Sequence, residues 1–240
     1  MVPGFLLGKL NIAAFLIASV ALGLCVYAGI HAASAGAASG GIGAPSGSQP
    51  ATKATGPAAT GTASGPAAVR GTRFGTRTLR EGMTGADVTV LKSIVRAKRL
   101  LRGALNGRFD RPTTSAVRRF QNKANLATNG VVTRATARRL VGSMKTAEAS
   151  WYGPGLYGNG TACGKVTLRP TTIGVANKNL PCGTRVLFGY RGKFAIATVI
   201  DRGPYGPGRT WDLTKAVADE LGFTSTGVGR VRHAIISRGK

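Results

Sequence analysis

The spacing of hydrophobic and polar positions changes several times along this 240-residue chain. Residues 10–30 are almost wholly apolar, with Lys9 immediately before them. Between residues 79 and 141, apolar positions recur at the spacing of one helical face. From Ala149 onward they fall in short runs separated by glycine and proline, which is typical of strands and turns. The chain is therefore predicted to be multidomain, with a small all-α domain followed by a mainly-β domain.

The N-terminal segment, residues 1–31, has two interpretations. About 20 consecutive apolar residues after a positive charge are enough for a transmembrane helix. The segment could equally be a long secretory signal that is cleaved near Ala33-Ser34-Ala35. Its length favours an uncleaved membrane anchor. Under both interpretations the rest of the chain is exported, either anchored to the cell membrane or secreted into the cell wall or periplasmic space.

A linker is predicted over residues 32–74. Gly, Ala, Ser, Thr and Pro dominate this stretch, which has almost no large apolar residue to form a core. We therefore expect a disordered tether that lets the following domains work at some distance from the membrane.

The helical spacing predicts three helices within residues 75–145. The first includes Asp87 to Val95, and Pro112 marks the start of the second. Thr133 opens the third helix after an Asn-Gly turn. These periodicities predict a small three-helix domain.

Residues 147–237 have the periodicity of strands. Apolar β-type runs occupy residues 184–188, 194–200 and 228–236. One helix fits between Leu213 and Leu221. About 90 residues of short strands with a single helix predict a small barrel.

The charge of the chain bears on its partners. The formal net charge is +25, from 33 basic and 8 acidic residues. Such a positive field attracts polyanions. An exported chain meets anionic cell-wall polymers first, and its basic residues are scattered without the interleaved aromatics of a nucleic-acid-binding patch. We therefore expect anionic wall polymers as partners, and no nucleic acid.

The cysteines of the C-terminal domain are Cys163 and Cys182. In an oxidising compartment two such residues usually pair. A metal site needs three or four ligands, and His31 and His233 do not complete one. We therefore predict a Cys163–Cys182 disulfide, no metal site and no cofactor.

Two carboxylates stand out in so basic a chain. Asp201 and Asp212 lie eleven positions apart, on either side of a loop rich in glycine and proline. Asp201 follows an apolar run that is predicted to be a strand, so the loop would bring the two residues together. Paired carboxylates in a cleft are typical of glycoside chemistry. The alternative is that each Asp only caps a turn or a helix.

The segment 150–155 places Trp151 and Tyr152 among small residues. Exposed, these rings would form a platform on which a sugar stacks. Buried, they would close the mouth of the barrel as a hydrophobic plug.

The helical domain carries three motifs in order: Leu79-x-x-Gly82-x-x-Gly85-x-Asp87-Val88, Gly107-x-Phe109-x-x-x-Thr113 and Leu126-x-x-x-Gly130-Val131. With these it resembles a peptidoglycan-binding domain of the three-helix type. The resemblance implies a cell-wall ligand without naming the contact residues. The alternative is a spacer domain, since a fold does not by itself fix a function.

The C-terminal domain carries five motifs in order: Ala149-Ser150-Trp151-Tyr152-Gly153, Gly160-Thr161-Ala162-Cys163-Gly164, Leu180-Pro181-Cys182-Gly183, Asp201-Arg202-Gly203-Pro204 and Gly208-Arg209-x-x-Asp212-Leu213. With these it resembles the RlpA-like (rare lipoprotein A) family. The resemblance implies a six-stranded double-psi β-barrel related to expansins and barwin. In that family several members are septal lytic transglycosylases, and others only bind peptidoglycan.

Two positions depart from the catalytic members of that family. They usually carry an acid where this chain has Lys165, and they tend to have a histidine where it has Asn177. Lytic transglycosylation can proceed with one well-placed acid, because the sugar's own hydroxyl attacks. We therefore assign catalysis to Asp201, supported by Asp212. Substrate binding is assigned to Trp151, Tyr152, Lys165, Asn177, Arg202 and Tyr205.

The resemblance implies two candidate functions. The first is a lytic transglycosylase, a lyase that cleaves the glycan strand while the helical domain holds peptidoglycan. The second is a non-catalytic, expansin-like protein that binds or loosens the cell wall. In both, the partners are peptidoglycan glycan strands and anionic wall polymers, with cell-division proteins as further candidates.

Overall fold

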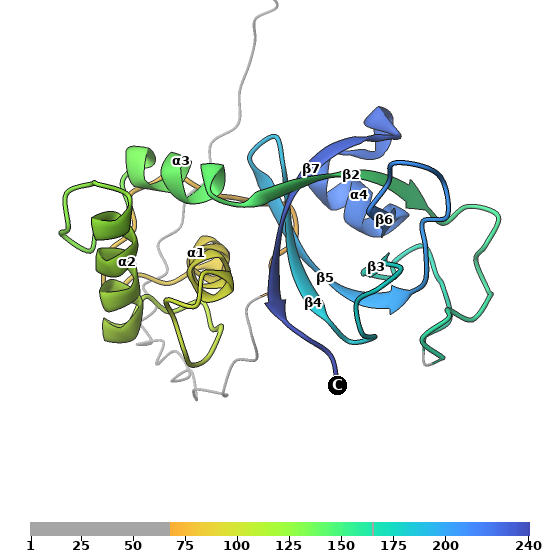
Figure 1. Cartoon of the computed structure of the whole chain (residues 1–240), viewed down its shortest axis with the longest axis horizontal. Coiled ribbons are helices and arrows are strands. Elements are labelled where there is room, and N and C mark those ends of the chain that lie inside the picture. Colours follow the sequence, from red (N-terminus) through yellow and green to blue (C-terminus); the bar gives the residue numbers. More distant parts are fainter. Residues whose placement is uncertain (1–67, 165) are drawn as a thin grey trace, which may run out of the picture. The chain divides into compact units, whose positions relative to one another are not determined.

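The structure is a computed structural model that describes residues 68–164 and 166–240 (Figure 1). The predicted signal or anchor, residues 1–31, and most of the predicted linker lie outside the described residues, as does Lys165. Within the described ranges, no helix has both the length and the apolar character needed to cross a membrane.

Three helices form the helical domain, as predicted: α1 (Ala86–Ala97), α2 (Arg111–Lys123) and α3 (Arg134–Gly142). The side chain of Asp110 accepts a hydrogen bond from the Thr113 N–H and so caps the start of α2. Thr133 caps α3 in the same way by accepting from the Thr136 N–H. The apolar faces of the three helices meet in one buried cluster.

Lys92 of α1 is buried inside this domain although it carries a charge. Lys92 is 1% exposed. Its Nζ donates to Asn106 Oδ1 at 2.7 Å, to the Arg108 carbonyl at 3.0 Å and to Asp110 Oδ2 at 3.1 Å. Three acceptors thus compensate the ammonium for the water it loses. Burial alone would raise the pKa of Asp110, but hydrogen bonds from Thr113 and Lys92 together lower it below its usual value.

Asp110→Ala is expected to lower the free energy of unfolding by about 1–2 kcal/mol at pH 7, because α2 loses its cap and Lys92 loses a partner. The folded-state pKa of Asp110 is lowered, so its contribution is present above the unfolded pKa and is lost as the pH falls through the folded pKa. Urea unfolding of both proteins across acidic pH measures this. Asp110→Asn is the control, since it keeps a capping oxygen but does not titrate. If the difference in unfolding free energy between wild type and Asp110→Asn did not change with pH, the prediction would be wrong.

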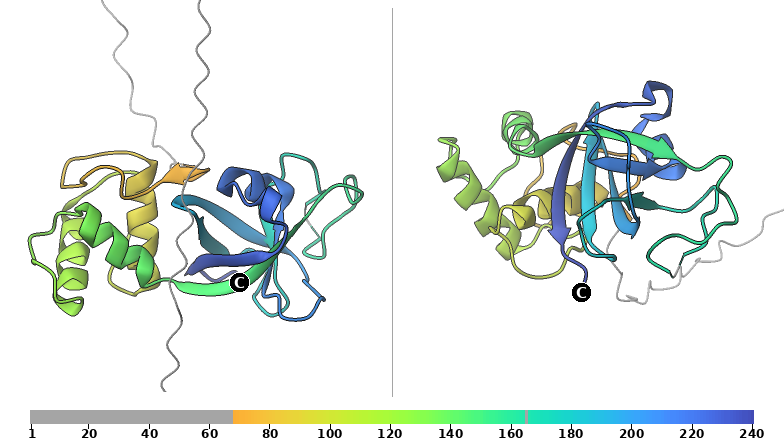
Figure 2. Two further views of the ribbon diagram at one scale, coloured as in Figure 1. Left: turned by 90° about the horizontal axis from the view of Figure 1, so that it is seen from above. Right: turned by 45° about the vertical axis from the view of Figure 1, so that its right-hand side comes forward.

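Six strands close into a barrel: β2 (Lys145–Tyr152), β3 (Gly174–Ala176), β4 (Arg185–Tyr190), β5 (Lys193–Asp201), β6 (Trp211–Thr214) and β7 (Gly229–Ser237) (Figures 1 and 2). Neighbours pair in the order β5–β3–β6–β2–β7–β4, and β4 pairs again with β5 to close the ring. The pairs β2–β6 and β3–β5 are parallel, and the other pairs are antiparallel. The predicted six-stranded barrel is thereby confirmed. The predicted helix is α4 (Lys215–Leu221), and a short 3₁₀ helix, η1 (Thr224–Thr226), follows it.

Strand β6 is held by the apolar core of the barrel. Trp211 is 2% exposed and packs edge to face on Phe188, with ring centroids 5.1 Å apart. Leu213 belongs to the same buried cluster. Because successive side chains of a strand point to opposite faces, Asp212 is directed away from this core.

Ordered structure begins earlier than the predicted linker boundary at residue 74. Strand β1 (Thr72–Arg73) pairs antiparallel with β5 (Figure 2). Phe74 is buried and packs edge to face on Phe194, at 6.0 Å between ring centroids. The linker prediction placed these residues in a tether because composition alone cannot reveal that a strand partner exists elsewhere in the chain.

The helical domain and the barrel share apolar contacts. Leu187, Phe194 and Ile236 of the barrel belong to the same buried cluster as the helices. Strand β2 begins at Lys145, three residues after α3 ends, so the predicted boundary between residues 145 and 147 falls inside a strand. Within residues 68–240, these two domains therefore pack as neighbours and are not joined by a linker.

Candidate active site

The two predicted carboxylates lie on strands that flank β3. Asp201 ends β5 and Asp212 is the second residue of β6, and both are in register with Ala176 of β3. Two strand spacings separate their Cα atoms by about 10 Å. The charge of Asp201 acts on Asp212, where it contributes to a raised pKa. The structure therefore brings the pair together across β3, as the sequence predicts.

Asp212 is half-buried beside Ser150, whose Oγ donates to Asp212 Oδ1 at 2.8 Å. Burial raises the pKa of the Asp212 carboxyl, and the charge of Asp201 raises it further. The Ser150 hydrogen bond and the charge of Arg209 act in the opposite direction without cancelling the shift. A carboxyl with a raised pKa is suited to donate a proton near neutral pH.

Asp201 is tied to two loops through one oxygen. Its Oδ1 accepts hydrogen bonds from the backbone N–H of Ala162 at 2.9 Å and of Arg202 at 2.8 Å. These bonds occupy both lone pairs of Oδ1. Among the hydrogen bonds of the described residues, none ends on Oδ2, but the Tyr152 hydroxyl lies close enough to the Asp201 carboxylate for the two groups to interact.

Tyr152, at the end of β2, faces these two carboxylates. Its hydroxyl is buried and makes no hydrogen bond of normal geometry with a described residue. Burial raises the pKa of Tyr152, and so do the charge of Asp201, the close approach of the hydroxyl to the Asp201 carboxylate and the charge of Asp212, so the phenol retains its proton. A phenol, two carboxyls and the Ser150 hydroxyl therefore converge at this end of the barrel.

Trp151 does not form the exposed platform that the sequence suggested. The ring is partly buried against the barrel core, and its Nε1 donates to the Thr224 carbonyl at 3.0 Å. Strand alternation explains the difference, because Trp151 points opposite to Ser150 and Tyr152. The hydrophobic-plug interpretation fits Trp151, whereas Tyr152 belongs to the carboxylate site.

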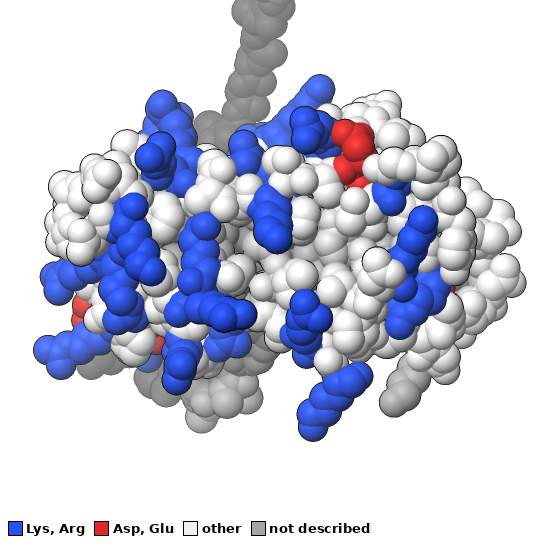
Figure 3. Space-filling view, viewed as in Figure 1, with Lys and Arg blue, Asp and Glu red and all other residues white. Residues whose placement is uncertain are grey.

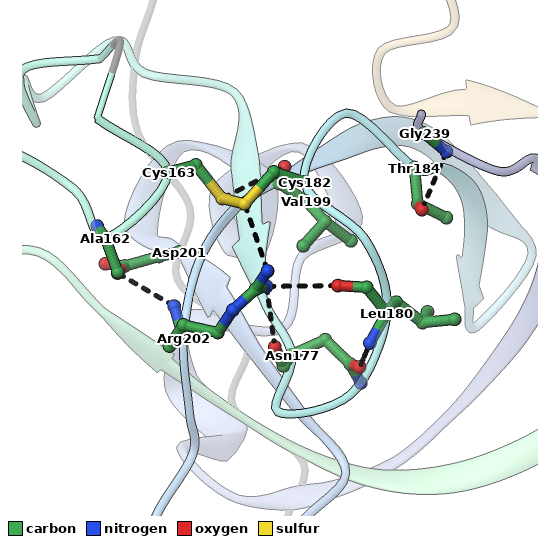
Figure 4. The surroundings of a disulfide bond; sticks show 10 residues. All are labelled: Ala162, Cys163, Asn177, Leu180, Cys182, Thr184, Val199, Asp201, Arg202 and Gly239. Carbon is green, nitrogen blue, oxygen red and sulfur yellow. Dashed lines mark hydrogen bonds between the residues drawn. A yellow bond between two sulfur atoms is a disulfide. The ribbon is translucent and has the colours of Figure 1, made fainter.

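The disulfide is confirmed, and the residues around it hold two loops together (Figure 4). Cys163 and Cys182 are bonded, with their Cα atoms 5.8 Å apart. The Arg202 guanidinium donates to the carbonyls of Asn177 at 3.2 Å and Leu180 at 3.0 Å, and contacts Cys182 Sγ at 3.1 Å. Arg202 thus uses three of its five N–H donors within the protein, which gives it a positioning role, and its contact with substrate stays a prediction.

Asn177 is 7% exposed, and its side chain is also engaged internally. Its Oδ1 accepts from the backbone N–H groups of Asn179 and Leu180, and its Nδ2 donates to the Thr210 carbonyl at 3.0 Å. Asn177 therefore fixes the distance between the turn after β3 and the loop that carries Asp212. One N–H of Nδ2 has no partner among the hydrogen bonds of the described residues, and the contact of Asn177 with substrate stays a prediction.

Tyr205 supplies the exposed aromatic surface that Trp151 does not. It is 80% exposed, three residues after the Asp201–Arg202 pair, and Lys178 Nζ lies 6.0 Å from its ring centroid. Lys165, which was also predicted to bind substrate, lies outside the described residues.

Sequence reasoning missed Ser150 and the role of Tyr152 beside the carboxylates. The signal was available in the spacing, because residues two apart on a strand share a face. Among the described residues, no three His, Cys, Asp or Glu side chains gather in the way a metal ion requires.

The comparisons with known proteins agree with this architecture. Residues 144–233 match a family described as "Lytic transglycolase", and residues 84–140 match one described as "Putative peptidoglycan binding domain". The chain thus joins a domain of the lytic transglycolase family, folded as a double-psi β-barrel, to a domain of the peptidoglycan-binding family.

Within that class, the chain is similar to proteins named RlpA. It is 34% identical over 160 residues to the "Probable endolytic peptidoglycan transglycosylase RlpA" of Synechocystis sp., a match that covers 66% of this chain and 46% of that protein. It is 39% identical over 99 residues to the "Endolytic peptidoglycan transglycosylase RlpA" of Pseudomonas aeruginosa, covering 41% and 28%. The chain therefore spans less than half the length of these relatives.

Among solved structures, an apo expansin of Clavibacter michiganensis is 18% identical, with 40% of this chain and 52% of that chain covered. The TM-score of 0.34 is too low for this likeness to carry an argument about function.

Proposed function

We propose that this protein is an exported peptidoglycan lytic transglycosylase that cleaves the glycan strand at the Asp201–Asp212 pair. The observation that carries the proposal is a carboxyl with a raised pKa, Asp212, near a second carboxylate, Asp201, that backbone N–H groups hold in place. The relatives named endolytic peptidoglycan transglycosylase support it. The helical domain would hold peptidoglycan while the barrel acts on the strand.

In this reaction Asp212, in its protonated form, donates its proton to the glycosidic oxygen as the C1–O bond breaks. The C6 hydroxyl of the same muramyl residue attacks C1 and forms the 1,6-anhydro ring. Asp201 Oδ2 accepts the proton that this hydroxyl releases, so no water is consumed. This assignment differs from the one expected from the sequence, in which Asp201 is the catalytic acid and Asp212 supports it. The raised pKa of Asp212 supports its role as proton donor, and the backbone N–H groups that hold Asp201 support its role as acceptor.

The alternative is an expansin-like protein that binds or loosens the wall without cleaving it. Two departures from the catalytic members of the RlpA-like family favour it. Lys165 stands where those members usually carry an acid, and Asn177 stands where they tend to have a histidine. Asn177 is turned into the protein, so it cannot replace a catalytic histidine at the surface. The carboxylates and Tyr205 would then bind sugar hydroxyls and rings.

Product analysis distinguishes the two functions. The purified chain is incubated with intact and with amidase-treated peptidoglycan, and the soluble fragments are identified by mass spectrometry. Anhydromuramyl fragments from the wild type, and none from Asp201→Asn/Asp212→Asn, are the expected result. Binding to peptidoglycan with no released fragment would overturn cleavage and support the alternative.

The proposal extends to the cellular setting. Residues 1–31 would export the protein and tether it to the membrane, the linker would give it reach, and cell-division proteins would recruit it. Support for these statements comes from the sequence alone, and membrane fractionation of cells that express the tagged chain tests the tether.

A further inference from the structure

A basic cleft lies where the helical domain meets the barrel, and neither Asp201 nor Asp212 lines it. Its lining comes from the end of α1, the start of β2 and the end of β7, and it has a volume of about 530 Å³. Five lining residues are basic and none is acidic: Arg96, Lys98, Arg99, Lys145 and Arg238. We call this the basic cleft.

The basic cleft continues into a second, more open groove on the helical domain, with a volume of about 1330 Å³. The two share Ala97, Lys98 and Ser143. The groove adds three basic residues and again no acidic one: Lys123, Arg138 and Arg139. Figure 3 shows Lys and Arg side chains gathered over the helical domain and toward the barrel, with few acidic side chains on this face.

These eight cations have no carboxylate partners among the described residues. The ion pairs of that part of the chain use Arg70, Arg77, Lys92, Lys215 and Arg230, none of which lines either hollow. The C-terminal end of α1 contributes only about half a negative charge to the basic cleft. Eight like charges along one concave surface therefore stay uncompensated, which favours an anionic ligand.

Arg99 occupies a position that helices usually give to glycine. Its φ is 60°, and the Leu100 N–H donates to the Val95 carbonyl at 2.9 Å, so α1 ends in a Schellman-type cap with arginine at the left-handed residue. Its side chain is exposed at the edge of the basic cleft. Glycine would suit this backbone better, so the arginine stands against local conformational preference.

We propose that the basic cleft and the adjoining groove bind a linear polyanion that carries phosphate groups. Guanidinium groups match the geometry of phosphate oxygens, and five of the eight cations are arginines. A polymer suits the shape better than a membrane surface, because the hollows are concave. The exposed large hydrophobic residues, Leu156, Tyr205 and Val228, lie outside both. This binding does not depend on cleavage of the glycan strand.

Binding of fluorescent linear polyphosphate to the full chain tests the proposal, with inorganic phosphate, poly-L-glutamate and phosphatidylglycerol vesicles as competitors. Arg99→Gly should weaken polyphosphate binding roughly two- to five-fold, as expected for loss of one exposed charge pair. The variant should also reduce, by about one, the slope of the logarithm of the polyphosphate binding constant against the logarithm of salt concentration. Thermal unfolding should show no loss of stability, because glycine accepts the left-handed backbone.

Arg191→Gly is the matched control. Arg191 also has a positive φ, of 44°, and carries one charge, but it lines neither the basic cleft nor the groove. Unchanged polyphosphate affinity in Arg191→Gly, with weaker binding in Arg99→Gly, supports the site. Equal losses in both variants would mean that only the general positive field binds. If vesicles, poly-L-glutamate or inorganic phosphate, compared at equal charge, bound more tightly than polyphosphate, the proposed phosphate-bearing polymer would be the wrong ligand.

Discussion

Asp212→Asn should reduce the release of anhydromuramyl fragments by about 10²–10⁴-fold, because the reaction loses its proton donor. Asn keeps the shape of the side chain and an oxygen that can accept from Ser150 Oγ. Binding to insoluble peptidoglycan should therefore change little. Timed digests of peptidoglycan, analysed by mass spectrometry, give the rate, and a pull-down with the insoluble polymer gives the binding.

Glu148→Gln is the matched control for this experiment. Glu148 lies on β2, the strand that also carries Ser150, and it forms a solvent-exposed ion pair with Arg230. This variant removes one carboxylate from the barrel without touching the pair, so its fragment release should equal that of the wild type. If Glu148→Gln and Asp212→Asn lowered the rate equally, the role of Asp212 as proton donor would be wrong.

Asp212→Asn also tests a prediction about stability. The folded-state pKa of Asp212 is raised, so the folded protein holds this proton more tightly than the unfolded chain does. Wild-type stability relative to Asp212→Asn should therefore fall as the pH rises from the ordinary Asp range through the folded pKa, and then level off. Urea unfolding at several pH values measures it. A less stable Asp212→Asn at neutral pH would instead indicate that Asp212 is a structural cap.

Loss of the disulfide should have the second large effect. Cys163→Ser/Cys182→Ser is expected to lower the free energy of unfolding by about 3 kcal/mol, because the bond closes a segment with a sequence separation of 19. The site should suffer as well. Ala162, which donates its N–H to Asp201, is the residue before Cys163, so the carboxylate loses part of its support when this loop is freed.

Denaturant unfolding with and without reductant measures this stability difference. The reductant should destabilise the wild type to about the level of the double variant and should leave the double variant unchanged. Fragment release by the folded double variant should also fall. Equal unfolding free energies for the oxidised wild type and the double variant would contradict a stabilising bond, and unchanged fragment release would contradict the support of Asp201.

Much of the fold could be predicted because its signals are local. Helix α2 begins after Asp110 with Pro112 in its first turn, and α4 lies within the predicted interval between Leu213 and Leu221. Strand β1 could not be predicted in this way. Thr72 and Arg73 form a strand only because β5, more than a hundred residues later, offers its edge.

The candidate site divides in the same way. The Asp201–Asp212 pair and the disulfide were visible in sequence, because two acids flank one loop and two cysteines lie in a domain that is predicted to be exported. The functions of Asn177 and Arg202 were not visible. Their polar groups face loops of the protein, and only the folded chain decides whether an amide or a guanidinium meets a backbone carbonyl or a ligand.

By itself, the sequence determined the domain order, the three helices, the barrel class, the cysteine pairing and the identity of the two carboxylates. These follow from periodicity, turn residues and composition, which act over a few neighbouring positions. The tertiary structure alone decided that Asp212 is a half-buried carboxyl with a raised pKa, that Tyr152 and not Trp151 faces it, and that eight basic residues line two adjoining hollows. Burial and strand register set these properties, and both depend on residues that are distant in the chain.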